Sequence, residues 1–188
     1  MSADSTFFSI PHLFKVYLEP WNSNQPLPNT DEIKNLQSTG LRLVNETKEL
    51  ENTCLFKLRQ IEIDAKPIVD YLKLQSQKID LVLQFMLEQE MHHGDLYSGV
   101  KFGGGGFSIK SATAFAERAH FKATLFIKDE LICVLCIAEV NKCKKGEVDP
   151  YYSVNFNFKV IQTNDIEQLV QASLRVQQKQ LHNHKKSV

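Results

Sequence analysis

Four consecutive glycines, Gly103–Gly106, join two segments whose apolar and polar residues alternate as they do in β-strands. The segments are Leu96–Phe102 and Phe107–Ser111. Because glycine has no Cβ, such a run lets the backbone turn with positive φ, or lets another group approach closely. A phosphate-binding P-loop would need Lys-Ser/Thr and then a helix after its last glycine, whereas a strand pattern follows here. The run therefore predicts a turn between two strands.

The rest of the chain after Asp95 also has a β pattern. Strands are predicted over Thr124–Ile127, Leu131–Val140 and Tyr151–Phe158, with turn signals at Lys128–Glu130 and Lys144–Gly146. Short strands at such even spacing indicate an antiparallel barrel or sandwich. A final helix follows, which Asn164 can cap. Its expected buried stripe is Ile166, Leu169, Val170 and Leu174.

From about Thr47 to Met91 the apolar period is helical. One stripe follows alternating steps of four and three residues, as in a coiled coil. Pro67 interrupts it, so either the helix kinks, or one helix ends near Lys66 and a second begins with proline in its first turn. The stripe consists of Cys54 and then of the residues that we call the seam: Leu58, Ile61, Ala65, Ile68, Leu72, Gln75, Ile79, Val82 and Met86.

The seam has two interpretations. A long helix with a strict heptad pattern favours self-association through that stripe, with the lone polar residue Gln75 fixing the register. The alternative is an amphipathic helix that packs on its own domain. We expect four regions: residues 1–45 docked on the rest, 46–93 as the helical oligomerisation region, 94–182 as a β-barrel plus C-terminal helix, and 183–188 as a disordered tail.

Composition restricts the partners. The chain has 188 residues, with 22 Lys+Arg balanced by 22 Asp+Glu. No net field recruits a nucleic acid polymer or an anionic membrane. No stretch approaches the ~20 apolar residues of a membrane span, and the N-terminus lacks the basic region of a signal peptide. We therefore expect a cytoplasmic protein.

The cysteines do not predict a metal site. Cys133 and Cys136 have CxxC spacing, but they lie in an apolar segment that is predicted to be a buried strand. Residues three apart on a strand point to opposite faces, so the two thiols should diverge. We expect both to be reduced core residues without metal. No arrangement of nucleophile and base can be argued from the sequence, and we expect no enzymatic activity.

The region from about residue 95 to 181 resembles a known family. The glycine pair and strand Gly105–Ile109, the apolar segment Phe121–Leu125, the strand Tyr152–Phe156 and the helix residues Asp165–Leu169 with Gln177 and Gln178 are similar to the PilZ domain, a bacterial cyclic di-GMP receptor module. The resemblance implies an α+β protein. Its expected form is a six-stranded antiparallel PilZ-like β-barrel with a long N-terminal heptad helix before it and a C-terminal helix after it.

The family's ligand residues are mostly absent. PilZ domains bind the dinucleotide with an RxxxR motif ahead of the barrel and a D/N-x-S-x-x-G motif at the glycine turn. The second motif aligns on Lys101, Gly103 and Gly106, of which only Gly106 matches. No arginine occurs between Arg59 and Arg118, and lysine cannot supply the planar fork of a guanidinium.

The sequence as a whole therefore resembles a degenerate PilZ subgroup that oligomerises through a long helix. We expect a non-catalytic scaffold or adaptor, a homo-oligomer (dimer or tetramer) with an unidentified protein partner and without a cofactor. The alternative is a receptor for cyclic di-GMP or another nucleotide that uses Lys101, Lys110 and Arg118. The variant Lys101→Asp with Gly103→Ser would rebuild the second motif. We expect it to stay folded and still not bind, because the arginine pair is missing.

Overall fold

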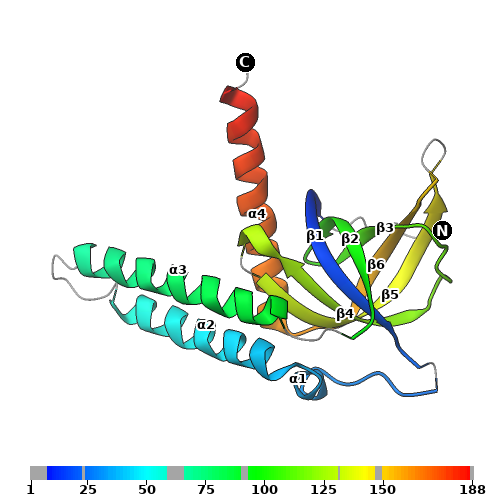
Figure 1. The fold of residues 1–188 in the computed structure, drawn as a ribbon, viewed down its shortest axis with the longest axis horizontal. Helices are drawn as coiled ribbons and strands as arrows, with labels where there is room; N and C mark the ends of the chain where they lie inside the picture. Colours follow the sequence, from blue (N-terminus) through cyan, green and yellow to red (C-terminus); the bar gives the residue numbers. More distant parts are fainter. Residues whose placement is uncertain are drawn as a thin grey trace. The chain divides into compact units, whose positions relative to one another are not determined.

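The protein consists of two compact units. The structure is a computed structural model that describes residues 8–22, 24–58, 66–89, 93–130, 132–146 and 150–186. One unit comprises Met1–Asn35 and His92–Val188, and the other comprises Leu36–Met91. Figure 1 shows a β-barrel and the C-terminal helix in the first unit and a helical hairpin in the second.

Six strands of the described residues close into a barrel in which every neighbouring pair is antiparallel. The order around the barrel is β1-β2-β3-β6-β5-β4, and β4 returns to β1. This agrees with the expected PilZ-like barrel. The strands are β1 (Ser9–Pro20), β2 (Asp95–Gly103), β3 (Gly106–Ser111), β4 (His120–Ile127), β5 (Ile132–Lys145) and β6 (Tyr152–Val160), with a short 3-10 helix, η1 (Lys128–Glu130), between β4 and β5.

The first strand corrects the expected order of elements. No long helix precedes the barrel in the described residues, because β1 begins at Ser9 and the long helices lie between β1 and β2. β1 pairs with β2 on one side and with β4 on the other, so it closes the barrel. The barrel therefore needs residues 9–20 in addition to the region from 94 onward. The register shifts between Pro11 and Phe14, and this bulge breaks the alternation that would have identified β1 as a strand.

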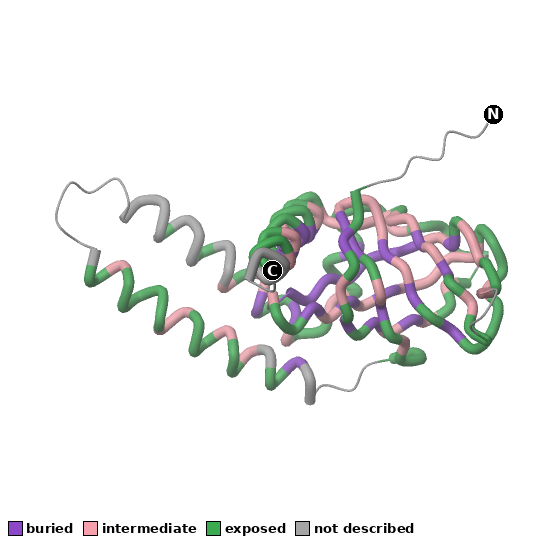
Figure 2. Tube along the Cα trace, turned by 90° about the horizontal axis from the view of Figure 1, so that it is seen from above, coloured by how far each residue is buried: buried purple, intermediate pink, exposed green. Residues whose placement is uncertain are grey.

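The barrel core consists mainly of the strand residues whose side chains face inward, which is every second residue along a strand. Buried residues alternate with more exposed ones along β1 and β3, as expected for strands with one face in a core, whereas the first seven residues of β5 are all buried (Figure 2). Phe107 and Phe156 stack at the centre with ring centroids 4.8 Å apart. Cys136 belongs to this core and Cys133 does not, although both are buried. The predicted opposite orientation of the two thiols is therefore confirmed.

Helix α4 (Thr163–Lys186) completes the first unit, together with the one-turn helix α1 (Glu32–Asn35). Leu169, Ala172 and Val176 of α4 join the barrel core. Val170 and Leu174 are exposed, so the predicted stripe was half wrong. The helix also continues to Lys186, through most of the segment that we expected to be a disordered tail.

The second unit is a hairpin of two helices, α2 (Thr39–Leu58) and α3 (Lys66–Gln89), which pack against each other. Pro67 is the second residue of α3, where its missing N–H costs no intrahelical hydrogen bond. This confirms the alternative in which a second helix starts with proline. α2 is described as far as Leu58 and α3 from Lys66 onward, and the two pack against each other, so the described seam residues are divided between two helices. None of the helices in the described ranges is long and apolar enough to cross a membrane.

Candidate functional site

The glycine run forms the turn between β2 and β3, with Gly104 and Gly105 at its tip. None of the four glycines has a positive φ, so left-handed backbone is not the reason for them. A Cβ on Gly103 would instead collide with the carbonyl oxygen of Phe8, and a Cβ on Gly106 with that of Phe156. Close approach of neighbouring backbone is therefore what requires glycine at these two positions.

The positions that align with the family's ligand motif offer little to a ligand. Gly103 and Gly106 have no side chain, and Lys101 is exposed on the outer face of β2. A serine at position 103 would have to displace Phe8. This close approach at Gly103 was invisible in the sequence, and the expectation that the rebuilt variant stays folded and does not bind stays a prediction.

Helix α4 lies against the tip of the same turn. A Cβ on Gly104 would be 2.6 Å from Cγ2 of Val170 and 3.7 Å from Cγ2 of Ile166. The carbonyl oxygen of Gly105 accepts a hydrogen bond of 3.1 Å from the backbone N–H of Phe158 on β6. The tip is thus occupied on one side by two apolar side chains of α4 and on another by β6.

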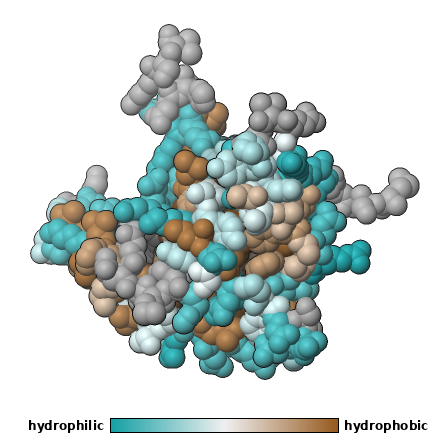
Figure 3. Space-filling model, turned by 45° about the vertical axis from the view of Figure 1, so that its right-hand side comes forward, coloured by the Kyte–Doolittle hydropathy of each residue, from teal (hydrophilic) through white to brown (hydrophobic). Residues whose placement is uncertain are grey.

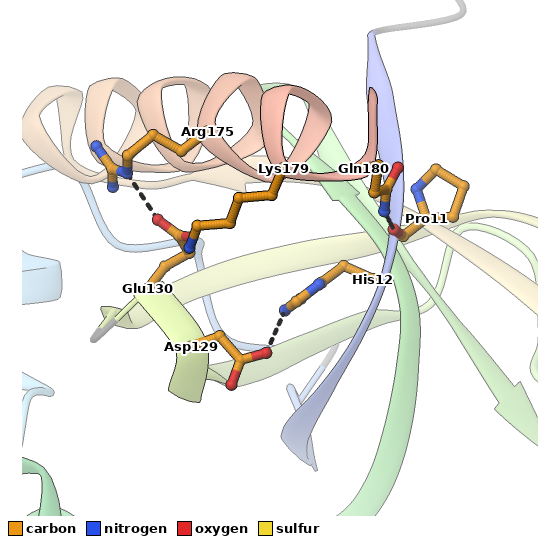
Figure 4. Close-up of polar contacts among 7 residues, drawn as sticks. All are labelled: Pro11, His12, Asp129, Glu130, Arg175, Lys179 and Gln180. Atoms are coloured by element: carbon orange, nitrogen blue, oxygen red, sulfur yellow. Dashed lines mark hydrogen bonds and ion pairs between the residues drawn. The ribbon is translucent and has the colours of Figure 1, made fainter. Parts of the chain in front are cut away.

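The second half of α4 is fastened to the barrel by polar contacts (Figure 4). Arg175 Nε and Lys179 Nζ donate to the two carboxylate oxygens of Glu130, at 2.6 and 2.7 Å. Gln180 Nε2 donates to the carbonyl oxygen of Pro11 at 2.8 Å. Burial raises the pKa of Glu130, but the hydrogen bonds from Lys179 and Arg175 outweigh it, so its pKa is lowered overall. These contacts stabilise the helix that covers the turn.

The three candidate nucleotide contacts do not form one cluster. Lys101 and Lys110 lie on the outer face of the neighbouring strands β2 and β3, where Lys101 pairs with Ser108. Arg118 precedes β4, has φ of 65°, and donates its backbone N–H to the carbonyl of Val140 on β5 at 2.8 Å. Strands β3 and β6 lie between β2 and β5 in the barrel. The backbone of Arg118, which bonds to β5, is therefore not adjacent to the strand that carries Lys101.

The seam residues of α3 are exposed. Ile68, Leu72, Ile79, Val82 and Met86 keep between 40% and 61% of their surface exposed, and Gln75 is half-buried. Ile61 and Ala65 lie outside the described residues, and Leu58 is the last residue of α2. The seam residues of α3 are therefore not buried by packing within the chain.

A second apolar stripe on α3 was missed in the sequence. Its members are spaced by three, seven and four residues, with Lys78 interrupting the four-and-three pattern, and they are 49% to 63% exposed: Tyr71, Leu74, Leu81 and Phe85. At about 100° per residue, this stripe lies about a quarter-turn from the seam. Figure 3 shows apolar residues at the surface of the helical unit, on the left of the view. A search for a second heptad register would have revealed it.

Solved structures share the fold. A tetrameric PilZ domain from Xanthomonas campestris, self-assembled through a helical bundle, superposes with a TM-score of 0.55 and 12% identity over 95% of this chain and 92% of that one. The Bacillus subtilis inhibitor of motility MotI/DgrA matches with a TM-score of 0.43 and 15% identity, over 45% of this chain and 43% of that one. MrkH from K. pneumonia gives 0.43 and 16%, over 47% of this chain and 42% of that one.

The sequence by itself gives no such match. No protein-family model matches the chain, and no curated protein matches it. The likeness to the Xanthomonas protein extends over the helices as well as the barrel, since it covers 95% of the chain. The protein therefore has the fold of a PilZ domain, with two long helices between its first and second barrel strands.

Proposed function

We propose that this protein is a non-catalytic scaffold or adaptor in bacterial cyclic di-GMP-related signalling, and that it assembles with copies of itself through α3. The observation that carries the proposal is the exposed seam, Ile68, Leu72, Ile79, Val82 and Met86, on a helix of a water-exposed hairpin. The helical bundle through which the Xanthomonas protein assembles supports this choice of surface.

The distribution of apolar residues around α3 supports an assembly larger than a dimer. α2 is one neighbour and can cover one side of α3, while the seam and the second stripe remain exposed on two other sides. A helix with exposed apolar residues on more than one side is normally packed against more than one neighbour. We infer that the seam forms one contact between copies and that the stripe of Tyr71, Leu74, Leu81 and Phe85 forms another, giving a tetramer.

The glycine turn supports the absence of dinucleotide sensing. The arginine motif of PilZ receptors has no counterpart in this sequence, and the glycine turn provides backbone only. Val170 and Ile166 of the protein's own helix lie against its tip. A phosphate would therefore find neither a guanidinium fork nor a hydroxyl there.

Light scattering on the purified protein tests the assembly. The chain has a mass of 21.5 kDa, and we expect a particle of four times that mass that does not dissociate at micromolar concentration. A particle of 21.5 kDa under these conditions would reject self-assembly through α3.

The alternative function is a nucleotide receptor with nonstandard contacts. Lys101 and Lys110 lie on adjacent strands of one face, which favours it, whereas the position of Arg118 does not. Isothermal titration with cyclic di-GMP separates the two functions. We expect no heat of binding in the micromolar range. Saturable heat that disappears in Lys101→Gln with Lys110→Gln would establish the receptor instead.

A further inference from the structure

Gln75 is the one polar residue of the seam, and it lies near the middle of α3. The seam residues around it on this helix are all apolar: Ile68, Leu72, Ile79, Val82 and Met86. The Gln75 side chain is half-buried in the single chain, while most of α3 is exposed (Figure 2). A contact between copies through the seam therefore takes a carboxamide group into an apolar interface.

The steps of four and three residues give each seam residue its heptad position. Leu72 and Ile79 take a positions, whereas Ile68, Gln75 and Val82 take d positions. Leucine at a with β-branched residues at d favours bundles of three or four parallel helices over a pair. In such a bundle the d residues point toward the common axis, so each d residue meets the same residue of the other copies at one level.

Gln75 also favours one orientation of the copies. If two copies of α3 paired antiparallel about Gln77, Gln75 would face Ile79 of the other copy, and its carboxamide would be buried against an apolar side chain at a cost in stability. In a parallel bundle in register, the Gln75 side chains of all copies lie at one level and can hydrogen-bond to one another. The seam therefore favours parallel copies in register.

Four Gln75 side chains can meet at the axis of such a bundle. Neighbouring helix axes lie about 8–10 Å apart, so in a square of four helices each helix axis is about 6–7 Å from the bundle axis. The Cα atoms lie on a radius of about 2.3 Å around their own helix axis, which puts an inward-facing Cα about 4 Å from the bundle axis. The extended side chain of glutamine is long enough to cover this distance.

Four carboxamides at one level have more donors than acceptors among themselves can satisfy. Each carboxamide has two N–H donors and one oxygen. If every Gln75 donates one N–H to the oxygen of its neighbour, the ring closes and one N–H of each copy is left. The side chains of Leu72 and Ile79, in the adjacent layers of the seam, offer no acceptor. Buried donors without acceptors are costly, whereas a small anion on the axis accepts from all four.

The nearest charged residues along α3 also favour an anion. They are Lys73 and Lys78, two and three residues from Gln75. Asp70, which pairs with Lys73 at 4.0 Å, and Asp80 are each five residues away. We propose that Gln75 and the same residue of three further copies bind one small monovalent anion, such as chloride, on the axis of the assembly. This inference rests on the proposed self-assembly through the seam and adds a ligand to it.

The NMR line width of chloride, added to the full-length protein in sodium gluconate, tests the site. Chloride that exchanges with an asymmetric protein site relaxes faster than free chloride, and gluconate is too large to compete for a site inside a bundle. We expect the wild type to broaden the chloride line and nitrate, a competing small anion, to reverse the broadening. Gln75→Leu should abolish it and keep the wild-type mass, because leucine continues the apolar seam. Gln77→Leu, at an exposed position, is the matched control and should broaden the line as the wild type does.

Several results would overturn the proposal. They are a chloride line that the wild type leaves unchanged, broadening that persists in Gln75→Leu, an equal loss in Gln77→Leu, and a lower mass of Gln75→Leu. Light scattering on the same samples reports the assembly separately. A wild-type particle of four times 21.5 kDa that does not broaden the line rejects the anion site and leaves the assembly standing. A wild-type particle of 21.5 kDa rejects the assembly and the site with it.

Discussion

Replacing Gly106 by alanine tests whether close backbone approach, rather than ligand binding, is the reason for the glycine turn. A Cβ at this position would lie 3.0 Å from the carbonyl carbon of Phe156 and 3.2 Å from Cα of Asn157, with the carbonyl oxygen nearer still. Carbon atoms in good contact are about 3.5–4.0 Å apart. β3 and β6 would therefore have to separate at this end of the barrel.

The cost can be worked from those contacts. Overpacking costs about 1–3 kcal/mol, and weakening a hydrogen bond between the two strands costs about 1 kcal/mol. Alanine has a smaller conformational entropy than glycine in the unfolded chain, which offsets this loss of stability by about 0.4–1 kcal/mol. The net loss in the free energy of unfolding is about 2 kcal/mol, and displacement of the stacked pair Phe107 and Phe156 acts in the same direction.

Urea unfolding of the variant measures this loss. The chain has one tryptophan, Trp21, whose backbone N–H bonds to the carbonyl of His120 in the barrel unit, so its fluorescence follows barrel unfolding. With a slope of about 2 kcal/mol per molar urea, the midpoint should fall by about 1 M. Gly105→Ala is the matched control, because within the described part of the chain a Cβ there meets no neighbouring atom. Equal midpoints for Gly106→Ala and the wild type would refute the close-approach explanation.

Two further predictions concern single side chains of the barrel unit. Glu130→Gln should lower the free energy of unfolding at neutral pH by about 1–2 kcal/mol. Because the folded pKa of Glu130 is below its usual 4.5, this difference should be fully present above pH 4.5 and vanish as the pH falls through the folded pKa. Equal pH profiles for Glu130→Gln and the exposed control Glu117→Gln would contradict it. Cys133 and Cys136 should react slowly with maleimide in the folded protein, because both are buried and burial raises the pKa of the Cys136 thiol. Rapid labelling of Cys136, stoichiometric zinc, or a disulfide between the two cysteines would overturn this prediction.

The sequence predicted the parts of the barrel that have local signals. Strands β2 to β6 and the turn at Gly103–Gly106 follow from alternation and turn residues, which act over a few positions. β1 does not, because its pairing partners in β2 begin at Asp95, far along the chain. Its bulge near Pro11 also disrupts the alternation. The pairing of two strands that are far apart in the sequence belongs to the tertiary structure, so local sequence patterns do not predict that β1 closes the barrel.

The candidate surfaces were predictable to different degrees. The seam on α3 was found because a heptad repeat is a local pattern. Its residues Ile61 and Ala65 lie outside the described residues, so that part of the stripe stays a prediction. The hydrogen bonds from Arg175 and Lys179 to Glu130 could not be predicted from the sequence, because they depend on α4 packing close to η1.

The most direct test of self-assembly through α3 is the mass of a matched pair of variants. Ile79→Glu places a charge in the centre of the seam, whereas Gln77→Glu places the same charge two residues away, on the polar side of the helix. Both positions are exposed in the single chain, so both variants should keep the wild-type helical content.

Burying an unpaired carboxylate costs at least about 2 kcal/mol per chain, so two facing chains lose about 4 kcal/mol and the dissociation constant rises about a thousandfold. By light scattering, we predict that Ile79→Glu, and more fully Ile79→Glu with Leu72→Glu, falls to a lower mass while Gln77→Glu keeps that of the wild-type assembly. If Ile79→Glu and the double variant both retain the wild-type mass and helicity, the seam is not the contact between copies and the central claim is wrong.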